Sequence, residues 1–304
     1  MIRKHCGGIE SRGKKYRKLT PLGVITEENE MVRVRLARQS ELRSGLDKHA
    51  GTAKWGIFLR APQIFFDVMT TWQKELSAKL VSIDSLLDIQ SGIPTRINEF
   101  FYLNAAEAAD RAIEGLYLHP VVKSTRSSDT IAINTKALDT LVFLCNRSKE
   151  ELRRLGHRGA LKYIEWGEAQ TTSAGVPWPE GPSVRNRKPG WWALGDCQLA
   201  QIFWTRFVGD KCYHMYSPKP VFADNALYVV QPRTQIDIEL LAAILNSSLF
   251  ALFQEVYART ALGGGLLQAF LDDIGRIVVP HPENVNPKSA RAIQAAFASV
   301  AKRP

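Results

Sequence analysis

The chain has 304 residues, 45% of them hydrophobic, which is enough to build one large domain or two modest ones around a core. Its 40 Lys and Arg residues outnumber the 30 Asp and Glu residues, and the formal charge of +10 favours a polyanionic partner such as nucleic acid. The four cysteines form no CxxC pair, and the sequence has neither a stretch of eighteen apolar residues nor a signal peptide. A zinc site, a disulfide framework, secretion and a membrane-spanning helix are therefore not expected, and the expected location is a reducing cytoplasm.

The N-terminal part differs in composition from the rest. Residues 1–53 are polar and basic, whereas apolar residues become dense after them. Seven Lys and Arg residues and the single Glu10 lie within residues 1–18, which indicates either a basic arm that contacts phosphates or a solvated terminus. We divide the chain into a basic lead-in (1–53), which a preceding catalytic domain could have left behind, a main domain (54–282) and a C-terminal helix (283–304).

Hydrophobic periodicity predicts helices and strands in an order without regular βαβ units. The clearest helix is Asp237–Tyr257, where apolar residues recur at helical spacing. This order favours an α+β fold with a mixed sheet, one long amphipathic helix and a C-terminal helix. The expected helices are Pro62–Leu80, Ala105–Glu114, Lys149–Glu168, Asp237–Tyr257 and Pro287–Lys302; the expected strands are Met31–Leu36, Leu86–Gln90, Phe100–Leu103, Thr130–Asn134, Leu141–Leu144, Leu199–Val208, Cys212–Met215, Ala226–Val230 and Asp273–Pro280; and Thr171–Gly190 is an expected loop.

The sequence shows no catalytic constellation. It contains no glycine-rich dinucleotide or P-loop motif and no GxSxG or HExxH motif, and its six histidines are scattered singly. A cofactor-binding glycine motif and an Asn/Asp-Pro-Pro-aromatic tetrapeptide, both expected in a DNA adenine methyltransferase, are absent. We therefore assign no catalytic residue, no metal ligand and no cofactor to this chain.

The expected loop is rich in Pro, Gly and Ser and ends in a basic stretch beside two tryptophans. Arg185, Arg187 and Lys188 can donate to phosphate or guanine, and the rings of Trp191 and Trp192 follow directly. One interpretation is a mobile loop that enters a DNA groove. The other is that both tryptophans anchor the loop to the core while the cations are only solvated.

A second candidate region is the turn between two expected strands. The segment Gly92–Asn98 carries Thr95, Arg96 and Asn98, and a turn between strands is a good place for side chains that read base edges. A purely structural turn, with Asn98 bonded to the backbone, fits the same spacing. The sequence does not choose between these alternatives.

A run of three glycines follows the long expected helix and Arg259. Because glycine has no side chain, the backbone at Gly264 could approach a phosphate closely, although a turn that ends the helix explains the run nearly as well. The candidate DNA contacts, which include two cations assigned to phosphates (Lys123 and Arg126), are Thr95, Arg96, Asn98, Lys123, Arg126, Arg185, Arg187, Lys188, Trp191, Arg259 and Gly264.

Four sequence blocks resemble one family when taken in order. The segment Leu87–Leu103 (LDIQSGIPTRINEFFYL) resembles the opening motif of the C-terminal target-recognition domain in adenine-specific DNA methyltransferases of restriction–modification systems, of the type IIG kind. The further blocks are Trp191–Leu194, Leu245–Leu249, and Arg259–Leu267 followed by Ile277–Pro280. The family commonly has glycine where Arg96 stands, so the first turn is expected to differ here.

The resemblance implies a function for the main domain. In the family, this region follows a domain that binds S-adenosylmethionine, and it grips double-stranded DNA so that the target adenine can be flipped. The chain is therefore expected to be a DNA-binding specificity module without methyl-transfer activity, and the cofactor is expected only in a catalytic partner. Two alternatives stay open: a DNA-binding subunit of a split, active methyltransferase, and a non-functional gene remnant.

Overall fold

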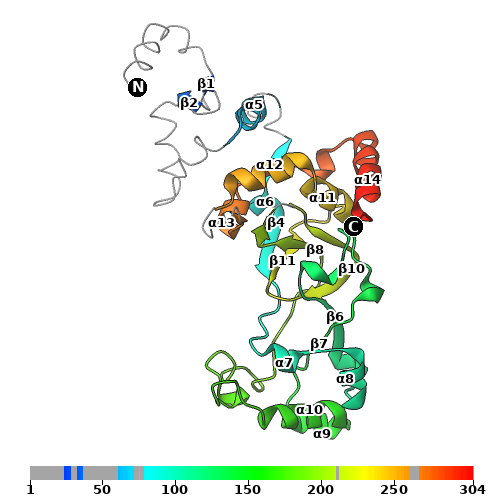
Figure 1. Ribbon diagram of the computed structural model, residues 1–304. Coiled ribbons are helices and arrows are strands. Elements are labelled where there is room, and N and C mark those ends of the chain that lie inside the picture. The colour runs from blue at the N-terminus through cyan, green and yellow to red at the C-terminus, as the bar shows by residue number, and fades with distance from the viewer. Residues whose placement is uncertain are drawn as a thin grey trace.

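The computed structural model describes residues 24–28, 33–36, 61–71, 75, 79–209, 212–259 and 267–303. The part from residue 79 onward is elongated, with helices at one end, a sheet in the middle and a second group of helices at the other end (Figure 1). Before it lie two strands, β1 (Val24–Glu28) and β2 (Arg33–Leu36), which pair in an antiparallel hairpin. The strand expected at Met31–Leu36 is thus present as β2.

A seven-stranded sheet runs through the molecule in the order β4-β11-β8-β10-β6-β7-β5. Its neighbours are antiparallel except β10 and β6, which pair in parallel. Helices and a mixed sheet together confirm the α+β class. The sheet strands are β4 (Leu87–Ser91), β5 (Tyr102–Leu103), β6 (Leu118–Val122), β7 (Leu141–Phe143), β8 (Ala200–Thr205), β10 (Met215–Ala223) and β11 (Leu227–Pro232), and the small pairs are β9 (Phe207–Val208) with β12 (Leu267–Gln268) and β3 (Leu80–Ser82) with β13 (Val278–Pro280).

The centre of the sheet is buried on both faces. In β8, Ile202 and Trp204 face the core formed with the helices, whereas Phe203 faces a second cluster together with Val229 of β11. Because neither face meets solvent, β8 consists almost entirely of apolar residues instead of alternating with polar ones. This double burial explains why a plain apolar run was sufficient to predict the strand.

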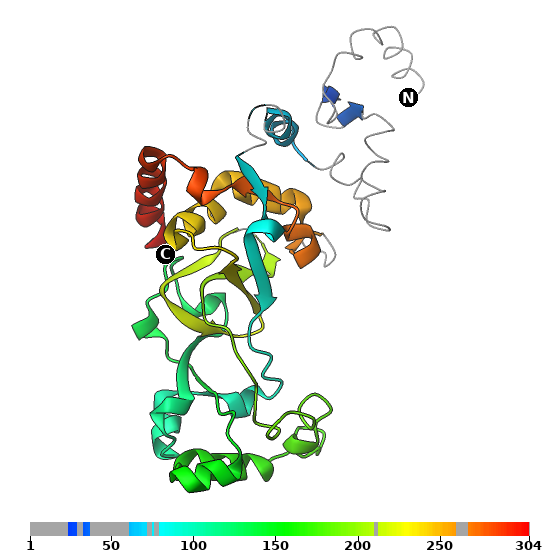
Figure 2. The ribbon, with the colours of Figure 1, turned by 180° about the vertical axis from the view of Figure 1, so that it is seen from behind.

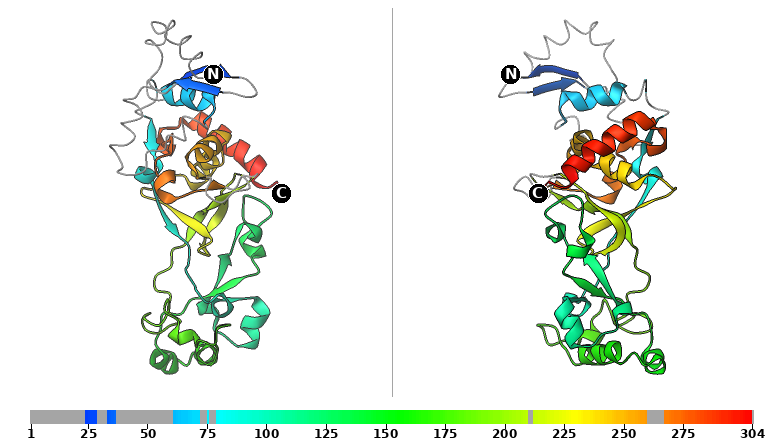
Figure 3. Two further views of the ribbon diagram at one scale, coloured as in Figure 1. Left: turned by 60° about the vertical axis from the view of Figure 1, so that its left-hand side comes forward. Right: turned by 90° about the vertical axis from the view of Figure 1, so that its right-hand side faces the viewer.

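One face of the sheet is covered by helices, and we call this region the helix-capped half (β4, β8 and β11 with α11, α12 and α14). α14 packs against α11, and its Phe297 and Ala301 enter the same core (Figure 3). The helices of this region are α5 (Gln63–Thr71), α6 (Ile83–Leu86), α11 (Ile238–Leu245), α12 (Ser248–Tyr257), α13 (Leu271–Ile274) and α14 (Pro287–Ala301), with a 3-10 turn η6 (Pro282–Asn284).

A buried histidine lies inside the helix-capped half. His214 is fully buried against the rings of Trp204 and Phe250, and its Nε2 lies 2.9 Å from Oε1 of Gln254. Burial lowers the pKa of the imidazole to about 3, and the bond with Gln254 opposes this only in part. His214 is therefore a neutral core residue.

The opposite end of the molecule is the aromatic lobe (residues 97–118 and 143–194). Its core is a cluster of Phe, Tyr and Trp rings, in which Phe100 contacts Phe143, Tyr163 and Trp191 among others. Figure 2 shows the lobe from behind, with the loop Thr171–Gly190 on its flank. The helices here are α7 (Asn98–Phe101), α8 (Ala105–Asp110), α9 (Lys149–Leu155) and α10 (Arg158–Glu168), and the 3-10 turns of the lobe and of the segment beside it are η2 (Gly115–Tyr117), η3 (Thr125–Ser127), η4 (Thr135–Ala137) and η5 (Trp178–Glu180).

Two expected helices are each broken into two. Asp237–Tyr257 forms α11 and α12, which are bent by 60°, because the Asn246 side chain bonds the backbone of His214 and Ser247 caps α12. Lys149–Glu168 forms α9 and α10, because Gly156 adopts a left-handed conformation with φ of 72°. Periodicity alone detected neither break.

Several expected strands are wrong or shorter. The first two residues of Phe100–Leu103 end α7, and its last two form β5. Thr130–Asn134 forms only a single parallel bridge, between Ala132 and Tyr216 of β10, and Asn134 then caps η4. Cys212–Met215 contributes only the first residue of β10, and Asp273–Pro280 begins within α13 before β13.

Within the described ranges no single helix is long and apolar enough to cross a membrane. The bent pair of α11 and α12 reaches the required length and apolarity only when both helices are counted together. Most apolar side chains of this pair lie in the core of the helix-capped half.

Candidate functional site

The turn Gly92–Asn98, called the 92–98 turn below, is fixed to the sheet at its first residues. A Cβ atom at Gly92 would lie 2.3 Å from the carbonyl oxygen of Asp224, so only glycine fits there. The next amide, of Ile93, donates to the carbonyl of Ala223 at 2.8 Å. The start of the turn therefore has a defined position against the end of β10.

The middle of the turn carries the buried Thr95, which is bonded within the turn, and one exposed cation. Thr95 is only 2% exposed and donates from Oγ1 to Oδ1 of Asn98 at 2.5 Å, so this pair stabilises the turn itself. Arg96 is exposed, and its φ of 69° lies in the left-handed region. This conformation costs a non-glycine residue about 1–2 kcal/mol, which explains why glycine suits the position.

Arg187 joins the loop Thr171–Gly190 to the 92–98 turn. Its Nη2 donates to the carbonyl oxygens of Pro94 at 3.0 Å and Thr95 at 3.2 Å, and its Nη1 donates to the carbonyl of Trp191 at 3.3 Å. Burial, and then the positive charge of nearby Arg96, lower the pKa of the Arg187 guanidinium. The donors of Arg187 are thus engaged within the protein, and we do not place it among the DNA contacts.

A buried pair supports the turn from the side of β5. The Tyr102 hydroxyl donates to Asp224, and burial, followed by this carboxylate, raises the pKa of Tyr102. The Nζ atom of Lys123 lies 5.1 Å from the centre of the Tyr102 ring. Beside them, burial and then Asp196 raise the pKa of the Cys197 thiol to about 11, so this thiol stays neutral.

Other predicted cations lie on segments that reach this site. Arg126 is exposed on η3, three residues after Lys123, and its amide donates to Ser124. Arg185 and Lys188 are exposed on either side of Arg187. The structure therefore brings two distant segments, 123–126 and 185–188, to the side of the 92–98 turn, and each of them carries exposed Lys or Arg side chains.

The two tryptophans after the loop are buried, which decides between the two interpretations of this region. Trp191 is 5% exposed and its ring centre lies 4.4 Å from that of Phe100. Trp192 is 6% exposed and donates from Nε1 to the carbonyl of Arg147 at 3.2 Å. Both rings anchor the loop, so the prediction that Trp191 presents a free face to DNA is wrong.

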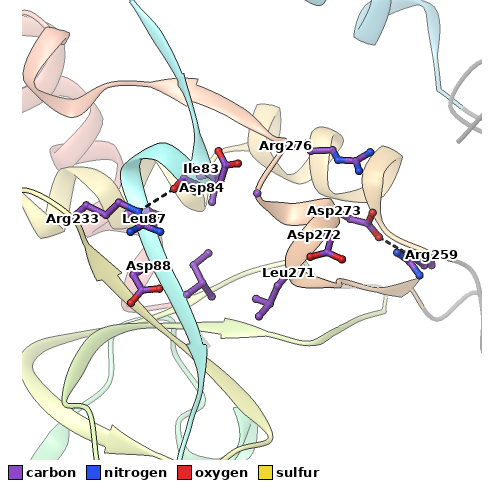
Figure 4. Close-up of a pocket in the computed structure, with 12 residues that line it drawn as sticks. Ile83, Asp84, Leu87, Asp88, Arg233, Arg259, Leu271, Asp272, Asp273 and Arg276 are labelled. Carbon is purple, nitrogen blue, oxygen red and sulfur yellow. Dashed lines mark hydrogen bonds and ion pairs between the residues drawn. The ribbon is translucent and has the colours of Figure 1, made fainter. Parts of the chain in front are cut away.

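The remaining candidates lie elsewhere. Arg259, in the helix-capped half, forms an ion pair with Asp273 at 2.8 Å, and its guanidinium lies 4.3 Å from the centre of the Phe270 ring. It lines a cavity of about 640 Å³ between β4, α6 and α13, together with other arginines and aspartates (Figure 4). The structure does not bring Arg259 to the 92–98 turn, and Gly264 lies outside the described residues.

Sequence reasoning missed two contributors to the site. Asp224 accepts from Tyr102, which is 122 residues away, and Arg206 donates from Nη2 to Ser91, directly before the turn, at 2.6 Å. Neither pair could be predicted from a local sequence pattern, because the strand order of the sheet brings the partners together from distant parts of the chain.

Across the residues that the structure describes, no group of three or more His, Cys, Asp and Glu side chains is arranged to hold a metal ion.

Comparisons with solved structures show a likeness of fold. The type IIG restriction endonuclease BpuSI has 12% identity and a TM-score of 0.57, and the match covers 90% of this chain but only 32% of BpuSI. The HsdS subunit from Thermoanaerobacter tengcongensis has 12% identity and a TM-score of 0.32, and the match covers 90% of this chain and 57% of that subunit. The type I restriction-modification S subunit from M. genitalium has 12% identity and a TM-score of 0.31, and the match covers 72% of this chain and 38% of that subunit. No curated protein sequence matches the chain.

The family comparison covers most of the chain. The model of the C-terminal domain of the type II methyltransferase M.Eco57I matches residues 64–301, from α5 to the end of α14. This agrees with the resemblance carried by the four sequence blocks. The chain belongs to the family of type II methyltransferase C-terminal domains represented by M.Eco57I.

Proposed function

We propose that this chain is a DNA target-recognition domain that gives sequence specificity to an adenine-specific methyltransferase, and that it transfers no methyl group by itself. Family membership supports a role within a restriction–modification enzyme. One observation carries the proposal further: two segments with exposed cations, 123–126 and 185–188, flank the 92–98 turn, which itself carries the exposed Arg96. Positive side chains held at defined positions can bind the phosphates of a DNA backbone, and a side chain among them can then reach the edges of the bases.

The proposed contacts divide into two classes. Lys123, Arg126, Arg185 and Lys188 are placed as phosphate contacts, because they are exposed cations outside the turn itself. Arg96 is exposed within the turn and is the candidate for reading base edges. The exposed Asn98 has its Oδ1 engaged by Thr95, so only its amide nitrogen remains to donate to a base.

The first test is a titration of the purified chain with random duplex DNA at two salt concentrations. We expect binding that weakens steeply with salt, with a slope that falls by about 0.9 for each phosphate contact removed. Lys123→Ala and Arg126→Ala should each lower the slope and weaken binding to all sequences alike. Arg291→Ala, at an exposed cation of α14 in the helix-capped half, is the matched control and should leave the slope unchanged.

Binding of S-adenosylmethionine is measured on the same preparations. DNA binding without cofactor binding is the expected result. Cofactor binding by the chain alone would contradict its assignment as a recognition domain only. A catalytic chain that copurifies and is needed for methylation would identify the split enzyme, whereas a chain that binds no DNA either alone or with such a partner would overturn the proposal.

A further inference from the structure

Arg96 is the one cation of the 92–98 turn, and it projects from a segment whose flanking residues are buried. Thr95 and Ile97, on either side of it, are 2% and 8% exposed, whereas Arg96 is exposed. The part of the chain that the structure describes offers the Arg96 guanidinium no hydrogen bond or ion pair. Its donors are therefore available to a ligand outside the protein.

The backbone that carries Arg96 is held from both ends. On one side, Gly92 packs against the carbonyl of Asp224, and the Asn225 amide donates to the carbonyl of Ile93 at 3.2 Å. On the other side, the amides of Phe100 and Phe101 both donate to the carbonyl of Ile97 at 3.1 Å. The direction in which Arg96 leaves the turn is thus set by the fold.

Arg187 completes this frame from a third direction. Two of its hydrogen bonds end on the carbonyls of Pro94 and Thr95, the two residues before Arg96, and its guanidinium lies 5.6 Å from the centre of the Phe101 ring. Like charges at Arg96 and Arg187 repel each other, and burial, followed by this repulsion, lowers the pKa of Arg187. An electron-rich ligand at Arg96 offsets this repulsion.

Two features therefore coincide at Arg96. Its backbone is left-handed, which costs an arginine conformational energy, and its charged neighbour Arg187 stabilises the turn but not the Arg96 side chain. Strained conformations that the surroundings enforce are concentrated at functional sites. A guanidinium presents two parallel N–H donors, and this geometry matches O6 and N7 of guanine in the major groove.

We propose that Arg96 reads a guanine in the major groove of the target DNA, and that Arg187 is the positioning residue that holds the turn for this contact. The inference rests on the proposed DNA binding of the chain. Arg187 is then not one of the residues that contact bases, and the exposed Arg96 is the side chain of this turn that reads the DNA sequence.

The test selects duplexes from a random library with the purified full chain and sequences the bound fraction. Wild-type protein should enrich a site with a guanine at one fixed position. Arg96→Gly should lose the preference at that position by about tenfold or more, while preferences at the other positions stay. Arg96→Lys should retain part of the preference, because lysine donates without the planar fork.

Arg187→Lys tests the positioning role separately. Lysine keeps the charge but cannot donate to three carbonyls in the same geometry, so the guanine preference should weaken while the salt slope on random duplex is unchanged. Lys123→Ala is the contrasting variant, which should lower the slope by about 0.9 and leave the preference intact. Thermal melting of each variant checks folding, and Arg96→Gly should melt no lower than wild type, because glycine accepts φ of 69°.

The opposite results are distinct. If Arg96→Gly weakens binding to all sequences equally and lowers the salt slope, Arg96 contacts a phosphate and the guanine assignment is overturned. Unchanged binding and unchanged sequence preference in Arg96→Gly would also overturn it. An intact preference in Arg187→Lys would overturn the positioning role. Wild-type protein that binds no duplex at all would instead refute the proposed function, and the guanine contact with it.

Discussion

The helix-capped half and the aromatic lobe are stabilised in different ways. In the helix-capped half, strands and helices bury mainly aliphatic side chains against the main sheet. The aromatic lobe packs its helices around a cluster of rings, and only β5, β6 and β7 connect it to the same sheet. The comparison shows that the 92–98 turn, which lies between them, is held by both: by β10 and β11 at its start and by α7 and Arg187 at its end.

The largest effect is expected from Phe100→Ala in the aromatic lobe. Phe100 is fully buried and contacts five other rings, so its loss should leave a cavity and reduce the free energy of unfolding by about 4 kcal/mol. Urea unfolding followed by tryptophan fluorescence measures this, because four tryptophans lie in the lobe. Since the sheet continues into both regions, one cooperative transition is expected; a separate early transition would show that the lobe unfolds independently.

A smaller loss is expected where the two regions meet. Tyr102→Phe removes the hydroxyl that donates to Asp224 and leaves a buried carboxylate with fewer donors, at a cost of about 2 kcal/mol. Denaturation of Tyr102→Phe, Asp224→Asn and the double variant measures the coupling. Losses that simply add would contradict a direct contribution of this hydrogen bond.

The helix-capped half should respond to acid through His214. The folded-state pKa of about 3 lies below the ordinary value of about 6.5, so between these pH values the unfolded chain binds a proton that the folded chain does not. Stability should therefore be unaffected by this group above about pH 6.5 and decrease below it, by up to about 1.4 kcal/mol per pH unit. Melting curves of wild type and His214→Gln from pH 7 to 4 test this, and equal pH dependence in both proteins would exclude His214 as the cause.

The smallest effect concerns the turn between the two regions. Arg96→Gly should increase the free energy of unfolding by roughly 0.5–1 kcal/mol, because glycine removes the cost of the left-handed backbone but adds entropy to the unfolded chain. Arg96→Ala keeps that cost and is the control. A loss of stability in Arg96→Gly would show that the arginine side chain stabilises the fold.

The sequence was sufficient to predict features that depend on local pattern. The strands β4, β7, β8 and β11 were found from their apolar residues, whereas β6 and all but the first residue of β10 were not predicted; α14 was predicted to within one residue of its end. The breaks at Gly156 and Asn246 were missed, because each depends on a cap or on a contact with a distant residue. The parallel pairing of β10 with β6 has no local signal either.

The candidate site followed the same rule. The 92–98 turn and its Arg96 were singled out because their residue types are visible in one segment. What Arg187 and Trp191 do could not be read in this way, since burial and partner choice decide whether a cation or a ring is available to a ligand. The sequence showed which donors exist, and packing showed which of them the protein already uses.

The outermost strand of the sheet has a consequence for solubility. Within the described residues β4 pairs only with β11, so its other side could accept a strand from a second molecule, the first step of edge-to-edge aggregation. That side borders the cavity in Figure 4, where the carboxylates of Asp84, Asp88 and Asp272 gather. A strand added there would have to bury several charged side chains, aspartates and arginines alike, and at the far end β5 offers only two residues to pair with. Charge at one edge and shortness at the other therefore protect the sheet from self-association.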